Sequence, residues 1–218
     1  EPTVNNYAKT IKKYGDTLNA NVYNILIPTH VEFALPSKYK NLASEQKPVI
    51  DLVNSKLGKN VTPVDAYSIL KQHKTEYIYF RSDHHWTQLG AYYAYTKFCE
   101  TAGLKPCNLD DYPLKLYNGS KEKKLADNPD VVEYRPVGGD LTATIYQNSS
   151  LTKKLEYSPY SDYSTGSNAY GTFLHGDNPL TIIKNPDIDS SKKVVVIKES
   201  YGNAFAPLLT QNYGEVYV

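Results

Sequence analysis

The sequence predicts an α/β protein in which helices cover both faces of a sheet. Helical patterns alternate with short apolar runs along most of the 218-residue chain. These runs are continuous rather than alternating, which is typical of strands that are buried on both faces. We therefore expect a mostly parallel sheet and a single domain over residues 1–218. One region of different composition, at about 112–185, interrupts the pattern.

Four residues within 5–19 recur at spacings of 4, 3 and 4, which predicts an amphipathic helix. They are Tyr7, Ile11, Tyr14 and Leu18. The elements expected next are a strand at 22–27, a helical pattern at 49–57, a strand at 61–64, a helix at 66–74, a strand at 77–80 and a helix at 87–102. Thr87 is the expected N-cap of the last helix, and Gly103 ends it.

Between about 112 and 185, helical periodicity fades and Gly, Pro, Asn, Ser and Tyr become frequent. Short alternating runs such as 142–146 indicate a loop and β-hairpin insertion on the main sheet. After it, residues 192–197 are the most strand-like run of the chain, and a helix through about 211 and a strand at 215–218 follow. The sequence ends at that strand, and we expect further elements beyond it.

Composition excludes several classes of protein. The formal net charge is +1, whereas a nucleic-acid binder needs a basic face. No apolar run approaches the ~20 residues of a membrane span, and residues 1–20 lack a signal-peptide core. The chain has no methionine, from which we expect an excised fragment.

Cys99 and Cys107 flank a predicted helix end, where a disulfide or two buried thiols are both compatible with the sequence.

Two places carry residues suited to catalysis, and each follows a predicted strand. The first is the run from Arg81 to Trp86. In an extended backbone Asp83 and His85 share one face, so the carboxylate can hold the imidazole while His84 points elsewhere. The second is Ser200, at a strand-to-helix turn where backbone N–H groups can form an oxyanion hole.

Simpler interpretations exist for both places. A serine at such a junction is commonly an N-cap, and an Asp-x-His pair is commonly a structural hydrogen bond. A metal site is a further alternative if His30 or His175 joins the pair, although neighbouring histidines on a strand face opposite ways.

The run Tyr79-Phe80-Arg81-Ser82-Asp83-His84-His85-Trp86-Thr87-Gln88-Leu89-Gly90-Ala91 resembles the signature of the DHHW family. That family is similar to the SGNH-hydrolase-like domains of alginate O-acetyltransferases. The resemblance implies a three-layer SGNH-hydrolase-like sandwich over most of the chain. It also implies a permuted order in which the Asp-His dyad precedes the serine.

Carried over by position, the resemblance implies that Ser200 is the nucleophile, His85 the base and Asp83 its orienting group. The backbone N–H of Ser200 or Tyr201 would line the oxyanion hole, with Gly202 or Asn203 adding to it. Arg81 is a further candidate for substrate binding. Independently of the resemblance, His30 follows the first strand, where it either lies at the rim of the same cleft or is a loop histidine without a role. One departure stands out, because related turns often read Gly-Asp-Ser or Gly-Thr-Ser whereas this chain has Lys198-Glu199-Ser200.

Together with these residues, the resemblance implies transfer or hydrolysis of an O-acyl group, most simply acetyl, on a cell-surface polysaccharide. The alternative is a non-catalytic carbohydrate-binding or envelope-assembly domain of the same fold. We expect an extracytoplasmic monomer that needs no metal and no organic cofactor and binds no nucleic acid.

Aromatic residues give weaker signals. Trp86 is expected to support the core beneath the motif rather than to stack on a sugar. Four tyrosines of the insertion either form a carbohydrate platform or cover a small hydrophobic patch. They are Tyr157, Tyr160, Tyr163 and Tyr170.

Overall fold

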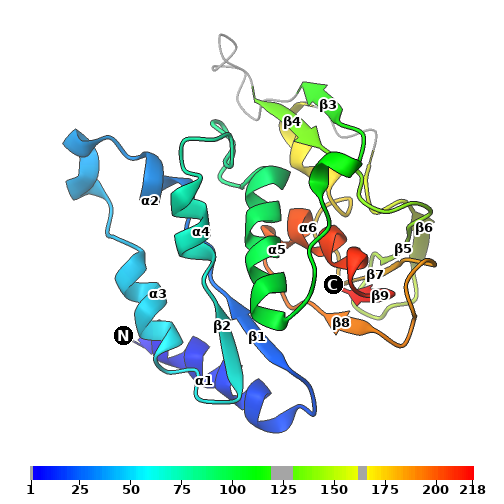
Figure 1. The fold of residues 1–218 in the computed structure, drawn as a ribbon, viewed down its shortest axis with the longest axis horizontal. Coiled ribbons are helices and arrows are strands. Elements are labelled where there is room, and N and C mark those ends of the chain that lie inside the picture. The colour runs from blue at the N-terminus through cyan, green and yellow to red at the C-terminus, as the bar shows by residue number, and fades with distance from the viewer. Residues whose placement is uncertain (1, 119–129, 162–165) are drawn as a thin grey trace. The chain divides into compact units, whose positions relative to one another are not determined.

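A computed structural model describes residues 2–118, 130–161 and 166–218 (Figure 1). The chain divides into two compact units, residues 1–74 and 75–218. Whether they form the single expected domain stays a prediction. The mixed α/β character expected from the sequence is confirmed, because helices and strands occur in both units.

The first unit places helices against one parallel pair of strands. Its elements are α1 (Pro2–Thr17), β1 (Val22–Ile25), α2 (His30–Ala34), η1 (Ser37–Leu42), α3 (Lys47–Asn54), β2 (Val61–Val64) and α4 (Ala66–Gln72). Strand β1 pairs with β2 from Val22 opposite Val61 to Ile25 opposite Val64. Helix α1 buries Val4 and Ala8 against a core that includes Val53.

The second unit is built on a mixed five-stranded sheet with the order β6-β5-β7-β9-β8. Its elements are α5 (Gln88–Ala102), η2 (Leu109–Asp111), β3 (Lys115–Asn118), β4 (Val131–Tyr134), β5 (Thr142–Tyr146), β6 (Lys154–Tyr157), η4 (Gly166–Thr172), β7 (Leu180–Lys184), β8 (Lys193–Val195), α6 (Gly202–Phe205), η5 (Ala206–Gln211) and β9 (Glu215–Tyr217). The red helix α6 contacts the green helix α5 (Figure 1).

The expectation of a mostly parallel sheet is wrong. Strands β5, β6, β7 and β9 pair antiparallel, as do β3 and β4 in a separate ribbon. The parallel pairs among the described residues are β1 with β2 and β8 with β9. The region interpreted as an insertion supplies β5, β6 and β7 of the main sheet, because β5 and β6 form the expected hairpin and β7 pairs alongside.

Residues 77–80 do not form the expected strand. A single antiparallel bridge joins Tyr79 to Trp86, so the chain turns back on itself around the Asp-His-His run. The helix after the motif begins as predicted, since Thr87 Oγ1 accepts the Gly90 N–H at 3.3 Å. Gly103 ends it in a left-handed conformation with φ 68°. Gly90 has to be glycine, because a Cβ there would collide with the carbonyl oxygen of Ile78.

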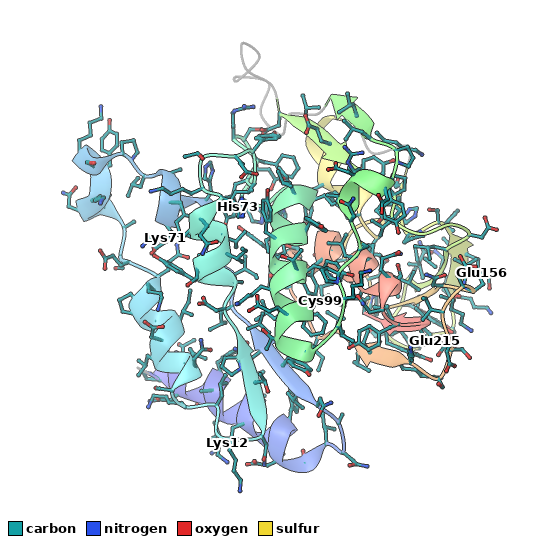
Figure 2. The ribbon with its side chains drawn as sticks, in the orientation of Figure 1. Lys12, Lys71, His73, Cys99, Glu156 and Glu215 are labelled. Carbon is teal, nitrogen blue, oxygen red and sulfur yellow. The ribbon has the colours of Figure 1, made fainter. Side chains whose placement is uncertain are left out.

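Both cysteines are free thiols in this structure. Cys99 is buried on α5 (Figure 2), and its burial raises the pKa of the thiol to about 11. Cys107 is half-buried, and its backbone N–H donates to the Tyr95 hydroxyl at 3.2 Å. Burial raises the pKa of Cys107 as well, so both thiols stay protonated at neutral pH.

Candidate active site

Ser200 lies in the turn that leads from β8 to α6, as the sequence predicted. Its Oγ lies 2.6 Å from Nε2 of His85, a residue 115 positions earlier in the chain. Because Ser200 is half-buried and His85 is only 5% exposed, this contact is largely removed from water.

Asp83 completes the hydrogen-bonded series. Its Oδ1 lies 2.6 Å from Nδ1 of His85 and also accepts the backbone N–H of His85 at 3.0 Å. A carboxylate only accepts hydrogen bonds, so Nδ1 carries the proton and Nε2 is left to accept the serine hydroxyl. The predicted convergence of Asp83, His85 and Ser200 is therefore confirmed as geometry.

Asp130, which sequence analysis missed, anchors the loop that carries this dyad. It is buried and accepts the backbone N–H groups of Arg81 at 2.8 Å and Ser82 at 2.7 Å. It also accepts the hydroxyls of Tyr77, at 2.6 Å, and Ser82. Burial alone would raise the pKa of Asp130, but these hydrogen bonds outweigh it and hold the pKa below its usual value.

We expect Asp130→Asn to destabilise the protein by about 1–3 kcal/mol at pH 7, because an amide cannot accept all of these donors. A carboxyl with a depressed folded pKa stabilises the fold above its unfolded pKa, near 3.9, and loses this effect as pH falls through the folded value. The difference from the unmodified protein should therefore shrink below about pH 4. Urea unfolding at pH 7 and pH 3 measures it.

The control is Asp110→Asn, at a carboxylate that is 83% exposed. It should change stability by less than about 0.5 kcal/mol at either pH. A deficit of Asp130→Asn that is equal at both pH values would contradict the role given to the ionised carboxylate.

The sequence predicted that His84 points to the opposite face from His85, and this prediction is wrong. The two imidazole rings are adjacent, with centroids 3.9 Å apart, and His84 Nδ1 lies 3.5 Å from Asp83 Oδ1. The reason is that residues 81–85 form successive bends and not a strand, so side chains do not alternate. The Tyr201 hydroxyl holds this path by donating to the His84 carbonyl.

Asp83, His84 and His85 also form a group with metal-ligand chemistry. One ligand atom from each lies within 4.8 Å of the others. The alternative of a metal site considered from the sequence drew on His30 or His175, whereas this group contains His84. His84 is exposed, whereas His85 Nδ1 already engages Asp83.

Three of the backbone N–H groups expected at an oxyanion hole, those of Tyr201, Gly202 and Asn203, are used inside the turn. The Tyr201 N–H donates to the Glu199 carboxylate at 3.0 Å, and the Gly202 N–H to the Glu199 carbonyl at 3.0 Å. The Asn203 N–H donates to the Ser200 carbonyl at 3.1 Å. An oxyanion role for these groups stays a prediction, because it requires these hydrogen bonds to be exchanged.

The unusual turn residue Lys198 is accommodated by a glycine four positions later. A Cβ at Gly202 would lie 2.6 Å from the Lys198 Cβ. The Lys198 ammonium pairs with Asp177, which also accepts Asn203 Nδ2 at 3.1 Å. Burial would raise the pKa of Asp177, but these two partners hold it below its usual value.

Three of the aromatic residues singled out from the sequence lie in the core and not on the surface. Trp86 is buried and donates its indole N–H to the Tyr201 carbonyl at 2.9 Å, so its expected role in the core is confirmed. Tyr160 and Tyr170 are buried and cannot present their faces to a sugar. Tyr157 is 47% exposed, and Tyr163 lies outside the described residues.

Arg81 and His30 are the remaining predicted site residues. The Arg81 guanidinium lies 4.7 Å from the centroid of the Tyr77 ring. His30 begins α2 in the first unit, and its place at the substrate stays a prediction.

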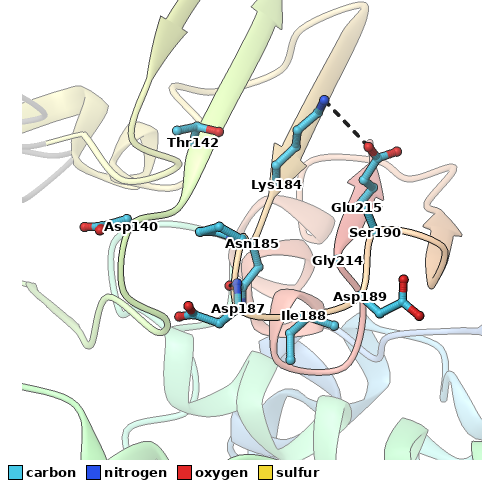
Figure 3. A pocket seen from close by; sticks show the side chains of 11 residues that line it. Asp140, Thr142, Lys184, Asn185, Asp187, Ile188, Asp189, Ser190, Gly214 and Glu215 are labelled. Atoms are coloured by element: carbon cyan, nitrogen blue, oxygen red, sulfur yellow. Dashed lines mark hydrogen bonds and ion pairs between the residues drawn. The ribbon is translucent and has the colours of Figure 1, made fainter.

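A pocket of about 720 Å³ lies around the ends of β7 and β9 (Figure 3). Asp140, Asp187 and Asp189 contribute carboxylates to its lining, and Lys184 pairs with Glu215 at 3.6 Å. None of the predicted site residues lines it.

Comparisons with known proteins place this geometry in context. The sequence model of a family described as "DHHW protein" matches residues 2–218. A crystal structure of a DHHW family protein from Eubacterium siraeum has a TM-score of 0.87 at 30% identity, covering 99% of this chain and 75% of that one. PatB1 of Bacillus cereus with a sulfonyl adduct has a TM-score of 0.75 at 22% identity, covering 99% and 76%. A search of curated proteins finds no match.

Proposed function

Because this chain belongs to the DHHW family, we propose that it is a serine-dependent enzyme that transfers or hydrolyses an O-acyl group, most simply acetyl, on a cell-surface polysaccharide. The observation that carries the proposal is the hydrogen-bonded series from Asp83 through His85 to Ser200, with 2.6 Å at each contact of the imidazole. We further propose that the protein acts outside the cytoplasm. In this proposal the two units belong to one three-layer SGNH-like domain. No helix among the described residues is long and apolar enough to cross a membrane.

The proposed reaction starts when Ser200 Oγ attacks the carbonyl carbon of the ester. His85 Nε2 takes the hydroxyl proton as the new bond forms, and Asp83 stabilises the resulting imidazolium. His85 then gives the proton to the departing oxygen, which leaves an acyl-Ser200 ester. A sugar hydroxyl or a water releases the acyl group in a second step of the same kind.

One observation favours a non-catalytic alternative. The Glu199 carboxylate accepts the Tyr201 N–H, a group that an active turn needs for the oxyanion. A carbohydrate-binding or envelope-assembly domain would retain the fold and tolerate this arrangement.

We expect a fluorophosphonate to label the protein at one residue, Ser200, because such reagents react with a serine whose proton is removed by a neighbouring base. Intact mass before and after reaction gives the stoichiometry, and peptide mapping identifies the modified residue. Denatured protein is the control and should remain unlabelled. Absence of labelling in the folded protein, or labelling elsewhere, would support the non-catalytic alternative.

A further inference from the structure

Tyr170 makes the flattest aromatic contact of the site. It lies in η4, is buried, and its ring stacks on His85 with centroids 3.8 Å apart and planes at 8°. Phe173 and Phe80 hold the ring edge-on, with centroids 5.4 and 6.2 Å away. Aromatic packing on three sides fixes the plane against which the imidazole lies.

The hydroxyl of Tyr170 reaches the nucleophile turn. It lies 3.1 Å from the Ser200 carbonyl oxygen and 3.2 Å from that of Tyr201. Burial raises the pKa of Tyr170 well above its usual value, so the hydroxyl stays protonated and donates to these carbonyls. One side chain thus contacts the proposed base with its ring and the turn of the proposed nucleophile with its hydroxyl.

We propose that Tyr170 is a positioning residue that holds the His85 imidazole in the plane from which Nε2 meets Ser200 Oγ. The effect of Tyr170 on the reaction rate rests on the proposed function. The stacking of Tyr170 on His85 is independent of it. When His85 takes the serine proton, the imidazolium lies against a phenol face, which attracts a cation. A ring tilted out of this plane would move Nε2 away from Oγ, and small misplacements of reacting groups cost rate steeply.

The test compares Tyr170→Phe and Tyr170→Leu with the same changes at Tyr160. Tyr160 is also buried and stacked on an aromatic ring, Tyr134, and its hydroxyl accepts the Val137 N–H at 3.3 Å. Two quantities are measured: the second-order rate of fluorophosphonate labelling, and the chemical shifts of the His85 ring protons. The latter are assigned among the five histidines with His85→Gln.

We expect an upfield ring-current shift of the His85 protons that persists in Tyr170→Phe and disappears in Tyr170→Leu. Labelling should fall on the order of 10²-fold in Tyr170→Leu and only about threefold in Tyr170→Phe. Tyr160→Leu should lower the melting temperature comparably without changing either quantity. This rescue by phenylalanine separates positioning from a need for buried volume.

Each other outcome has a definite meaning. Labelling of Tyr170→Leu at the unmodified rate, or an equal loss in Tyr160→Leu, would overturn the proposal. If Tyr170→Leu does not fold, the chemical shifts of the unmodified protein and of Tyr170→Phe still test the proposal. Absence of the upfield shift in these two proteins would show that Tyr170 does not stack on His85. An upfield shift without any labelling would refute the proposed function while supporting the hold of Tyr170 on the imidazole.

Discussion

Ser200→Ala is expected to abolish acetyl-ester turnover, with a loss in kcat on the order of 10⁶-fold, the scale for removing the nucleophile of a serine hydrolase. The alanine leaves His85 Nε2 in place but removes the atom that it contacts at 2.6 Å. Without Oγ no acyl-enzyme forms, and the remaining path is direct attack by water. Initial rates with a chromogenic acetyl ester, compared with buffer alone, measure the effect.

The matched control for this variant is Ser55→Ala. Ser55 is exposed at the end of α3 and donates its hydroxyl to the Leu52 carbonyl at 2.8 Å. The same chemical change there should leave turnover unchanged. Ser200→Ala protein that keeps its melting temperature and also keeps full turnover would rule out the serine mechanism.

The core of the candidate site could be predicted because its chemistry is local in the sequence. Asp83 and His85 are two residues apart, and Ser200 follows a strongly apolar run. The groups that support them could not be found this way. Asp130 and Tyr170 reach the dyad loop across 47 and 85 residues, counting from Asp83 and His85, and neither stands in a recognisable motif.

The errors in the fold have physical causes as well. Strand direction depends on how the chain returns between strands, and an apolar run such as 193–197 looks the same in either direction. In the structure β8 is an edge strand, where Val195 is 71% exposed. Edge and centre cannot be distinguished from hydrophobicity alone.

Helix α1 is a correctly predicted element whose buried face was predicted only in part. The predicted apolar row contained Tyr7 and Leu18, which are 38% and 53% exposed. Ile11 of that row does pack against the core, but the buried residues of the helix are Val4 and Ala8. The close approach to β2 occurs at Gly15, where a Cβ would lie 2.6 Å from Val61 Cγ2. Gly15 is small because α1 packs close to the strand at this point, where a larger side chain would not fit.

Asp83→Asn is expected to lower kcat by about 10⁴-fold with the fold retained, the scale of the corresponding change in a serine protease. Asp83 Oδ1 accepts both the His85 backbone N–H, at 3.0 Å, and Nδ1, at 2.6 Å. An amide oxygen in its place can keep both bonds and the fold, but it carries no negative charge to stabilise the imidazolium. An amide that turns its NH₂ toward Nδ1 instead stabilises the tautomer protonated at Nε2. That tautomer donates to Ser200 Oγ and cannot take its proton.

The control for Asp83→Asn is Asp177→Asn, which removes the same charge from a carboxylate that is 61% exposed. A solvent-screened charge contributes about 1 kcal/mol, so this variant should lose less than about tenfold. Equal losses would mean that net charge near the imidazole matters and the hydrogen bond to Nδ1 does not.

The Asp83-His84-His85 group gives the remaining test, since metal catalysis would make turnover sensitive to a chelator. If a chelator abolishes turnover and a fluorophosphonate leaves it unchanged, Asp83 and His85 are metal ligands and not parts of a proton relay.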